Sequence, residues 1–401
     1  MNDLFFELIR VALGNADRLS HKPKPKEWQM LYDMAKKQSL VGICFAGVQR
    51  LVNSERDDYY GMPEMLYLTW LGMAAKIQQR NEVVNHRCLD LQRMLLNDEI
   101  TSCVLKGQGI AALYECNSSN GSLQTKRPDG PSAKGSNGSS LRYLRQSGDI
   151  DVWCEGGRER IYKYSMEKLG EISGVNYHHI HFPVFEDTEV EMHIYPSFLS
   201  SPLRNKRLQD FCKLYAPCEC KTEEISTPSL AFNLVFIMLH CYRHLSGHGV
   251  GMRQVMDYYF VLREASLQLS PERKRESEMW IKKLGMERFA KALAWVIGYV
   301  FDGDPDSPSF TKGLGEGSFV PDEKEGRFLL SEIMQTGNMG HADERVDRSK
   351  LNSALGRYIY NFKRDLHVMR ICPHEALWEP WFNLVLYMRR KFVWSRKYNL
   401  K

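Results

Sequence analysis

Two aspartates separated by one residue, Asp149 and Asp151, have the types and spacing best suited to chemistry in this chain. They lie in the segment Ser147-Gly148-Asp149-Ile150-Asp151, whose continuation alternates as a β-strand does. Side chains at i and i+2 of a strand point to one face, so the two carboxylates would lie close together. Two such charges need a cation to stay ionised. Mg²⁺ would supply that charge, because it takes oxygen ligands and keeps open positions for phosphate oxygens.

A third carboxylate on a neighbouring strand would complete a site for two metal ions, and Glu191 is the best candidate. The predicted strand Glu189–Tyr195 places Glu191 and His193 on one face and its apolar residues on the other. Such a site suits phosphoryl or nucleotidyl transfer, since one metal activates the attacking hydroxyl and the other stabilises the leaving pyrophosphate. His193 would then either orient Glu191 or be an ordinary buried histidine satisfied by the backbone.

A glycine turn upstream of the acids could bind phosphate. Lys106-Gly107-Gln108-Gly109 follows the predicted buried strand Thr101–Leu105 and precedes the helical run Ile110–Glu115. The free N–H groups at the start of a helix, together with its dipole, favour bound anions. Lys106 would neutralise phosphate charge there, unless it is an ordinary surface lysine at a strand end.

The elements around these residues predict an α+β protein with a small mixed-sheet core between two helical regions. We assign residues 1–97 to the N-terminal helical region, 98–225 to the core and 226–401 to the C-terminal helical region. Residues 117–140 carry almost no large apolar side chains and are predicted to be a disordered insertion. Later helices are expected at 229–245, 250–264, 275–301, 325–336 and 351–395, with a loop at 302–324.

The order of these motifs resembles a poorly characterised bacterial family of nucleotidyltransferases within the DNA polymerase β-like superfamily. The resemblance spans most of residues 65–260. It includes a helical lead-in that ends near Arg80-Asn81, and it extends to Gly249–Asp257, a segment similar to the glycine-rich start of a family helix. The motifs that carry it are Val104-Leu105-Lys106-Gly107, Tyr114, Arg145 with Gly148-Asp149-Ile150-Asp151, Val190-Glu191-Met192-His193, and His240.

The resemblance implies a transferase that moves a nucleoside monophosphate from an NTP to an acceptor hydroxyl and releases pyrophosphate. Asp149, Asp151 and Glu191 would be catalytic and would bind two Mg²⁺ ions, with Mn²⁺ as an alternative. The residues expected to contact the nucleotide phosphates are Lys106, Gly107, Gln108, Arg145 and Gly148. Two features depart from the superfamily: Gly107 lies far upstream of Asp149, which the insertion would explain, and its usual Gly-Ser turn is Gly107-Gln108.

Other functions remain compatible with the same acids. The protein could be a catalytically inactive nucleotidyltransferase-fold protein that only binds, or a metal-dependent phosphodiesterase. A helical interaction protein in which the acids are incidental is a third alternative. The acceptor is not readable from the sequence, and a sugar or other small molecule, an RNA end or a protein side chain all fit.

Histidines outside this motif group give weaker signals. His240, His244 and His248 recur every four residues, as zinc ligands on a helix would, but neighbouring glycines predict that the helix ends before His248. His178, His179 and His181 alternate along a predicted strand, so they are not expected to converge as a set. Arg253 and Asp257, four residues apart, would form a helical ion pair or face the active cleft.

The bulk composition favours a protein of a reducing compartment. The formal net charge of +5 does not by itself indicate a nucleic-acid partner, and the ten cysteines form no dense framework, so we expect free thiols. No signal peptide or membrane-spanning stretch is recognised, which makes a cytoplasmic location the default. The aromatic and basic run Trp378–Lys401 could bind RNA or a membrane surface, although an amphipathic helix packed on the body is favoured.

Overall fold

The computed structural model describes most of the chain. The described residues are 2–55, 60–114, 140–172, 174–215, 223–247, 249–307, 309–315, 319–340, 343, 345 and 353–394. The predicted insertion at 117–140, apart from Ser140, lies outside them. So do Cys116, Cys218, Cys220 and His248.

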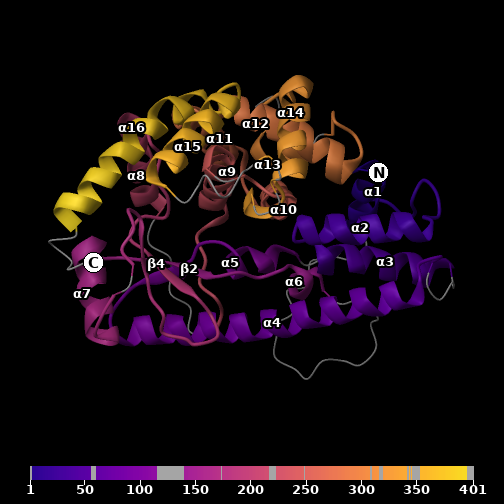
Figure 1. Ribbon diagram of the computed structural model, residues 1–401, viewed down its shortest axis with the longest axis horizontal. Coiled ribbons are helices and arrows are strands. Elements are labelled where there is room, and N and C mark those ends of the chain that lie inside the picture. The colour runs from indigo at the N-terminus through magenta and orange to yellow at the C-terminus, as the bar shows by residue number, and fades with distance from the viewer. Residues whose placement is uncertain are drawn as a thin grey trace.

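Four helices precede the sheet: α1 (Asn2–Leu13), α2 (Pro25–Lys37), α3 (Val41–Glu55) and α4 (Glu64–Asn97). The last is 34 residues long and runs beneath the whole molecule in the view of Figure 1. Its buried positions include Trp70 and Ala74 in the first half and Val84, Cys88 and Leu91 in the second. The second half therefore presents the apolar face that the helical spacing predicted.

The core holds a mixed four-stranded sheet in the order β1-β2-β4-β3. Its strands are β1 (Ser102–Val104), β2 (Ile150–Cys154), β3 (His179–His181) and β4 (Val190–His193). β2 and β4 are parallel and the outer pairings are antiparallel, so the parallel pair requires a crossover, which includes α7 (Gly157–Leu169). Between β1 and β2 lie α5 (Gln108–Ala111), η1 (Ala112–Tyr114) and α6 (Leu141–Leu144). The predicted α+β class with a small mixed sheet is confirmed.

The chain after the sheet is helical. The helical segments predicted at 275–301 and 351–395 are each divided into separate helices, because Gly285 adopts a φ of 77° and because Pro373 begins a new helix. The predicted loop at 302–324 contains α13. The elements are α8 (Pro202–Tyr215), α9 (Leu230–Gly247), α10 (Met252–Gln268), α11 (Pro271–Lys283), α12 (Glu287–Ile297), η2 (Gly298–Asp302), α13 (Ser309–Leu314), α14 (Glu323–Thr336), η3 (Asn338–Gly340), α15 (Ala354–Val368), α16 (Pro373–Arg389) and η5 (Arg390–Trp394).

Two apolar cores hold these layers together. The smaller core lies between the second half of α4, the sheet and α7. The larger core joins the N-terminal helices to α9, α10, α12 and α14. The buried Gln38 shows this joining, since its side-chain amide donates to the Ile333 carbonyl (2.9 Å) and its oxygen accepts from the Met252 N–H (2.9 Å). The predicted N-terminal helical region (1–97) and C-terminal helical region (226–401) thus share one apolar core.

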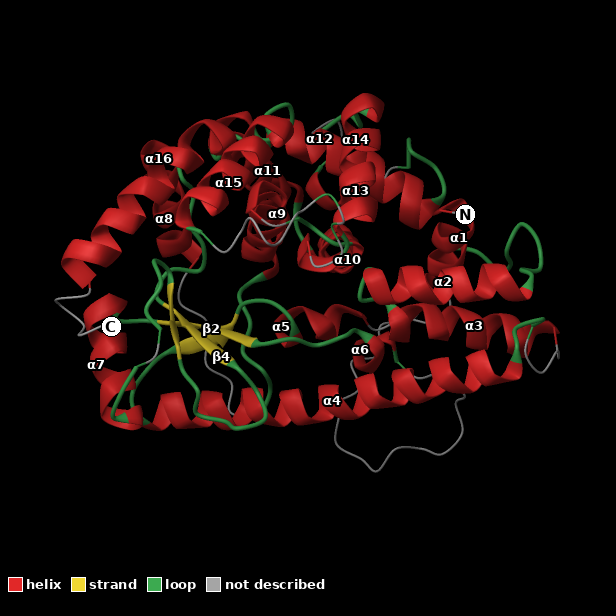
Figure 2. Ribbon diagram, viewed as in Figure 1, coloured by secondary structure: helices red, strands yellow, loops and turns green. Residues whose placement is uncertain are grey.

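The sheet is covered on two sides. In Figure 2 it lies between α4 below and the C-terminal helices above. The stacked rings of Trp153 on β2 and Phe232 on α9, with centroids 5.9 Å apart, link it to the upper layer. The seven cysteines among the described residues are buried free thiols, as predicted for them. Among the described helices, none combines the length and apolar character needed to cross a bilayer.

Gly42 on α3 should be essential for stability, because a Cβ there would come within 2.3 Å of the Leu144 carbonyl oxygen. The Gly42→Ala variant should lose about 1–3 kcal/mol of stability, the usual cost of overpacking. Gly72, on the exposed side of α4, has no atom within 4 Å of a built Cβ. Gly72→Ala should therefore gain about 0.5–1 kcal/mol from helix propensity. Denaturant unfolding measures both, and equal stability of the two variants would contradict this packing.

Candidate active site

The pairing of β2 with β4 brings two acids together. Asp151 lies directly opposite Glu191 in the parallel register, and Asp151 is only 2% exposed. His193 places its Nε2 2.8 Å from Asp151 Oδ1 and 3.4 Å from Glu191 Oε2. Lys106, just after β1, places its Nζ 3.0 Å from Asp151 Oδ2. Asp151 is therefore held between a lysine and a histidine.

The charges in this cluster stabilise one another. Burial alone would raise the pKa of Asp151, but Lys106 and His193 outweigh it and hold this pKa well below its usual value. Burial would likewise lower the pKa of Lys106, yet the neighbouring carboxylates raise it. Burial also opposes charge on His193, whose hydrogen bonds to Asp151 and Glu191 nevertheless raise its pKa to about 9. Lys106 and His193 thus stabilise the negative charge of the buried Asp151.

Asp149 lies just before β2 and is exposed. The negative charge of Asp151 raises the pKa of Asp149. Asp149 and Gly148 line a cavity of about 670 Å³ together with Arg80 of α4 and the loop at 183–189. Sequence reasoning did not assign Arg80 to this site, although Arg80 lies where the helical lead-in of the resembling region ends.

Glu191 opens into a second cavity, of about 500 Å³, between the sheet and the C-terminal helices. Its lining includes Lys106 and His193 from the core, Arg243 of α9, and Glu379 of α16. A volume of this size suits a small-molecule ligand. Asp149 and Glu191 therefore border different cavities.

The predicted glycine turn lies close to the acids. Gly107 precedes α5 with a φ of 59°, a conformation that favours glycine, and a Cβ there would come 3.8 Å from the Asp149 carbonyl oxygen. The side chain of Gln108 is buried and donates to Asn85 Oδ1 of α4 at 2.5 Å. Only the backbone of Gln108 thus remains for the phosphate contact that the resemblance implied.

Arg145 does not have the place expected of a phosphate ligand. Its guanidinium is buried and donates to both carboxylate oxygens of Asp257 on α10, at 2.7 Å each. The Tyr114 hydroxyl donates to the same carboxylate at 2.6 Å. The expected pairing of Arg253 with Asp257 is replaced, because Arg253 donates to the Gln146 carbonyl at 2.8 Å. These contacts anchor the segment that leads into β2.

Asn81 of α4 is a further anchor that sequence reasoning did not single out for a role. Its buried side-chain amide donates to the carbonyls of Tyr143 (2.7 Å) and Arg145 (2.8 Å). Since the helical lead-in of the resembling region ends near Arg80-Asn81, that position was a usable signal. Asn81 and Asp257 therefore hold the Arg145 segment from two different helices.

Two of the three histidines at 178–181 converge beside the acids. His178 and His179 lie in the Glu191 cavity and have ligand atoms near those of His193. Burial holds the pKa of His178 well below its usual value and lowers that of His179 to about 4. His181 lines the Asp149 cavity instead, so the three do not converge as a set. On α9 the rings of His240 and His244 lie 4.3 Å apart.

Residues 142–302 match the model of a family described as an uncharacterised nucleotidyltransferase. This segment is similar to the nucleotidyltransferases of that family. The match confirms the resemblance and supports nucleotidyl transfer as the general activity. It contains the acids and the Arg145–Asp257 pair, whereas Lys106 and Gly107 precede it. No curated protein and no solved structure matches the chain.

Nucleotidyltransferase families typically use divalent metals, and the residues present fit such an ion. The possible ligand atoms of Asp151, Glu191 and His193 all lie within 4.8 Å of one another. Carboxylate oxygens at this spacing suit Mg²⁺, which also takes ligands from phosphates. Asp149 is outside that group but close enough for its pKa to respond to Asp151.

The Arg145–Asp257 pair should contribute strongly to stability. Asp257→Asn leaves a buried guanidinium without its charge partner, a change that typically costs about 3–5 kcal/mol. Glu167→Gln is the control, because Glu167 pairs with Lys163 on the exposed surface of α7 at 3.6 Å. Exposed pairs contribute about 0–1 kcal/mol. Denaturant unfolding that finds both variants equally stable would contradict an anchoring role for Asp257.

Proposed function

We propose that the protein is a Mg²⁺-dependent nucleotidyltransferase that moves a nucleoside monophosphate from an NTP to an acceptor hydroxyl. The observation that carries the proposal is the pairing of Asp151 with Glu191 on adjacent parallel strands, within a segment of nucleotidyltransferase sequence. Asp149, Asp151 and Glu191 would hold two Mg²⁺ ions, with Mn²⁺ as an alternative. Bound Mg²⁺ would neutralise phosphate charge and acidify the acceptor hydroxyl.

The roles of the chain's own residues follow from their positions. The acceptor oxygen bonds to the α-phosphorus as the bond to the bridging oxygen breaks, and pyrophosphate leaves. Glu191, at the open cavity, would accept the proton of the acceptor hydroxyl. Lys106 borders the same cavity, and its ammonium would pair with phosphate oxygens when these enter. Arg145 would act on the reaction only by positioning the segment before β2.

His193 would orient the acids. It contacts both Asp151 and Glu191 and is itself buried, so its ring can fix the two carboxylates relative to each other. Of the two roles that the sequence left open, this contact pattern favours the orienting one.

Asp149, the acid just before β2, offers a mutational test that separates loss of activity from loss of stability. Asp149→Asn should abolish Mg²⁺-dependent pyrophosphate release from NTP, because the site loses a metal-binding charge. Stability should be nearly unchanged, since Asp149 is exposed. Asp151→Asn should also abolish turnover but should destabilise the fold, since Lys106 and His193 lose their buried partner. Asp90→Asn on α4, an exposed aspartate, is the matched control and should keep full turnover.

The assay should supply each labelled NTP with Mg²⁺ and host lysate and should follow which molecule becomes labelled. A labelled acceptor that appears with the wild type but not with Asp149→Asn supports the proposal. Nucleotide hydrolysis without a labelled acceptor would identify a phosphodiesterase. Calorimetric ATP binding without turnover would identify an inactive binding protein. Unchanged turnover in Asp149→Asn would refute the assignment of the acids.

A further inference from the structure

We propose that His178, His179, His193 and Glu191 form a site for a divalent transition ion such as Zn²⁺, beside the Mg²⁺ positions. The three histidines have possible ligand nitrogens within 4.8 Å of one another. Glu191 belongs to the neighbouring group with His193. The inference rests on the proposed function in that both sites use Glu191, but its test does not require turnover.

The spacing of the donor atoms carries the proposal. His178 Nε2 lies 3.3 Å from His179 Nδ1, and His179 Nδ1 lies 3.1 Å from Glu191 Oε2. Glu191 Oε2 lies 3.4 Å from His193 Nε2. Donors of a tetrahedral zinc site with bonds of about 2.0 Å are separated by about 3.3 Å. Three successive separations in this cluster thus already match a tetrahedral ligand set.

The backbone explains why these four side chains meet. His179 pairs with His193 across the antiparallel β3–β4 register, while Glu191 precedes His193 by two residues on the same face of β4. His178 lies just before β3, outside its regular alternation, so its ring can share a side with that of His179. The far nitrogen of His179, Nε2, hydrogen-bonds to the Asn176 amide, which leaves Nδ1 facing Glu191.

The donor set points to a transition ion. Imidazole nitrogens suit Zn²⁺ and similar ions, whereas Mg²⁺ prefers oxygen. The cluster also opens into the 500 Å³ cavity, which gives an ion a route of entry. Asp149 and Asp151 would remain the oxygen-rich side of the same centre.

Cobalt provides a test that is independent of catalysis. Chelator-treated wild-type protein titrated with Co²⁺ should develop visible d–d absorption bands that saturate near one ion per chain. Zn²⁺ should abolish the bands, and excess Mg²⁺ should not. His178→Ala and His179→Ala should each weaken Co²⁺ binding by more than about tenfold, since even residues behind the ligands affect affinity on that scale.

His181→Ala is the matched control, because His181 is on the same strand but lines the Asp149 cavity. His181→Ala should leave the cobalt spectrum unchanged, and Asp149→Asn should do the same. The cobalt-site proposal and the nucleotidyl-transfer proposal can therefore be refuted independently of each other. Wild-type protein without a cobalt spectrum would overturn the proposal whatever the variants do. Bands that persist in folded His178→Ala and His179→Ala, checked by circular dichroism, would also overturn it.

A separate observation concerns the outer face of α15, α16 and η5. The favoured expectation of a helix packed on the body holds for one side only, since many large apolar side chains of this region are exposed. Trp381 is 66% exposed and Leu384 is 47% exposed. The others are Leu355, Tyr358, Ile359, Phe362, Leu366, Leu377, Trp378, Val385, Tyr387, Met388 and Phe392. Large exposed apolar areas on soluble proteins often mark a binding surface.

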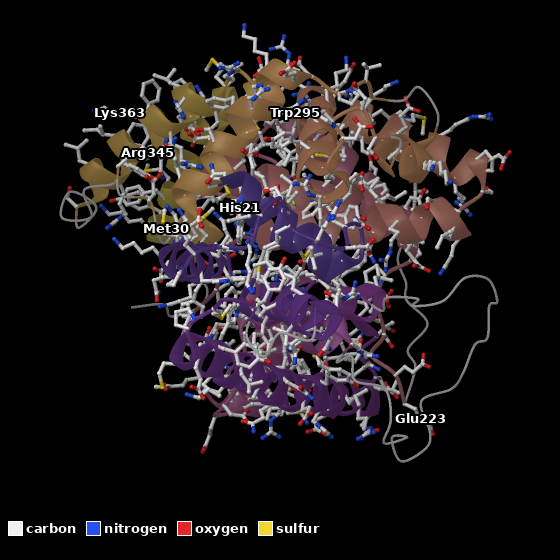
Figure 3. All side chains as sticks on the ribbon, turned by 90° about the vertical axis from the view of Figure 1, so that its right-hand side faces the viewer. His21, Met30, Glu223, Trp295, Arg345 and Lys363 are labelled. Carbon is white, nitrogen blue, oxygen red and sulfur yellow. The ribbon has the colours of Figure 1, made fainter. Side chains whose placement is uncertain are left out.

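In the same region, the acidic side chains are buried and the exposed charged side chains are basic. Its three acids, Asp365, Glu375 and Glu379, are all buried, and Glu375 and Glu379 face Arg243 of α9 at 2.7 and 3.7 Å. Exposed charges over 353–392 are basic, and they include Arg357, Lys363, Arg389, Arg390 and Lys391. Figure 3 shows Lys363 at the outer edge of the C-terminal helices. Between Ser353 and Phe392, no acidic side chain is exposed.

We infer that this α15–α16 face docks on an anionic lipid surface. Exposed tryptophans beside basic residues are typical of helices that lie in a membrane interface. A second copy of the chain would bring two basic faces together and is disfavoured by repulsion. The face would hold the protein against the bilayer without any helix crossing it.

Vesicle co-sedimentation tests the inference. The wild type should bind vesicles of phosphatidylcholine with phosphatidylglycerol and should bind pure phosphatidylcholine far less. Trp381→Asp with Leu384→Asp should abolish binding. The control Leu267→Asp, at a 71% exposed leucine on α10, should retain it. Arg389→Glu and Lys391→Glu should each weaken binding by at least about fivefold, the usual effect of one basic residue at a membrane.

Equal affinity for both kinds of vesicle, or none for either, would overturn the inference. Self-association lost in the Trp381 and Leu384 variant would identify a second copy as the occupant. RNA binding lost in the same variant, with no vesicle binding, would identify RNA. Each of these two outcomes also overturns the membrane assignment.

Discussion

The alignment of Asp151 with Glu191 across the parallel strands β2 and β4 is the constraint on which the site depends. A slip of one residue would turn every side chain of β4 to the other face of the sheet, and Glu191 and His193 would leave the cluster. The same register puts Met192 and Val190 into the small core, where both are fully buried. Burial of the apolar residues thus fixes the position of the polar ones.

A second constraint comes from residues far apart in the sequence. Arg145 reaches Asp257 across 112 positions, and Asn81 reaches the Arg145 carbonyl across 64. These contacts fix the path of the short segment between α6 and β2, in which Asp149 lies. The helical regions therefore do more than cover the sheet: they determine where its acids point.

The sequence allowed the strand bearing Asp151 and the strand bearing Glu191 to be predicted, because each has a periodicity that local residues express. The C-terminal helical segments were predicted, but the breaks within two of them were not. These breaks lie at Gly285 and Pro373, which interrupt an otherwise continuous apolar pattern. The partners of Arg145, Gln108 and Asn81 could not be predicted. Those contacts depend on which helix packs beside which loop, and no local pattern encodes that. The proximity of the His178 and His179 side chains was not predicted for a related reason, since His178 lies just outside the regular strand.

The length of α4 has a mechanical consequence. Its first half is part of the large core shared with the C-terminal helices, and its second half lies in the small core under the sheet. At 1.5 Å per residue, this single helix extends for about 50 Å. The side chains of the sheet and of the upper helices enclose the Glu191 cavity. Both of these layers are therefore linked to one continuous helix, α4. Any movement that widened the Glu191 cavity by separating the sheet from the upper helices would therefore have to bend α4 or disrupt one of its two cores.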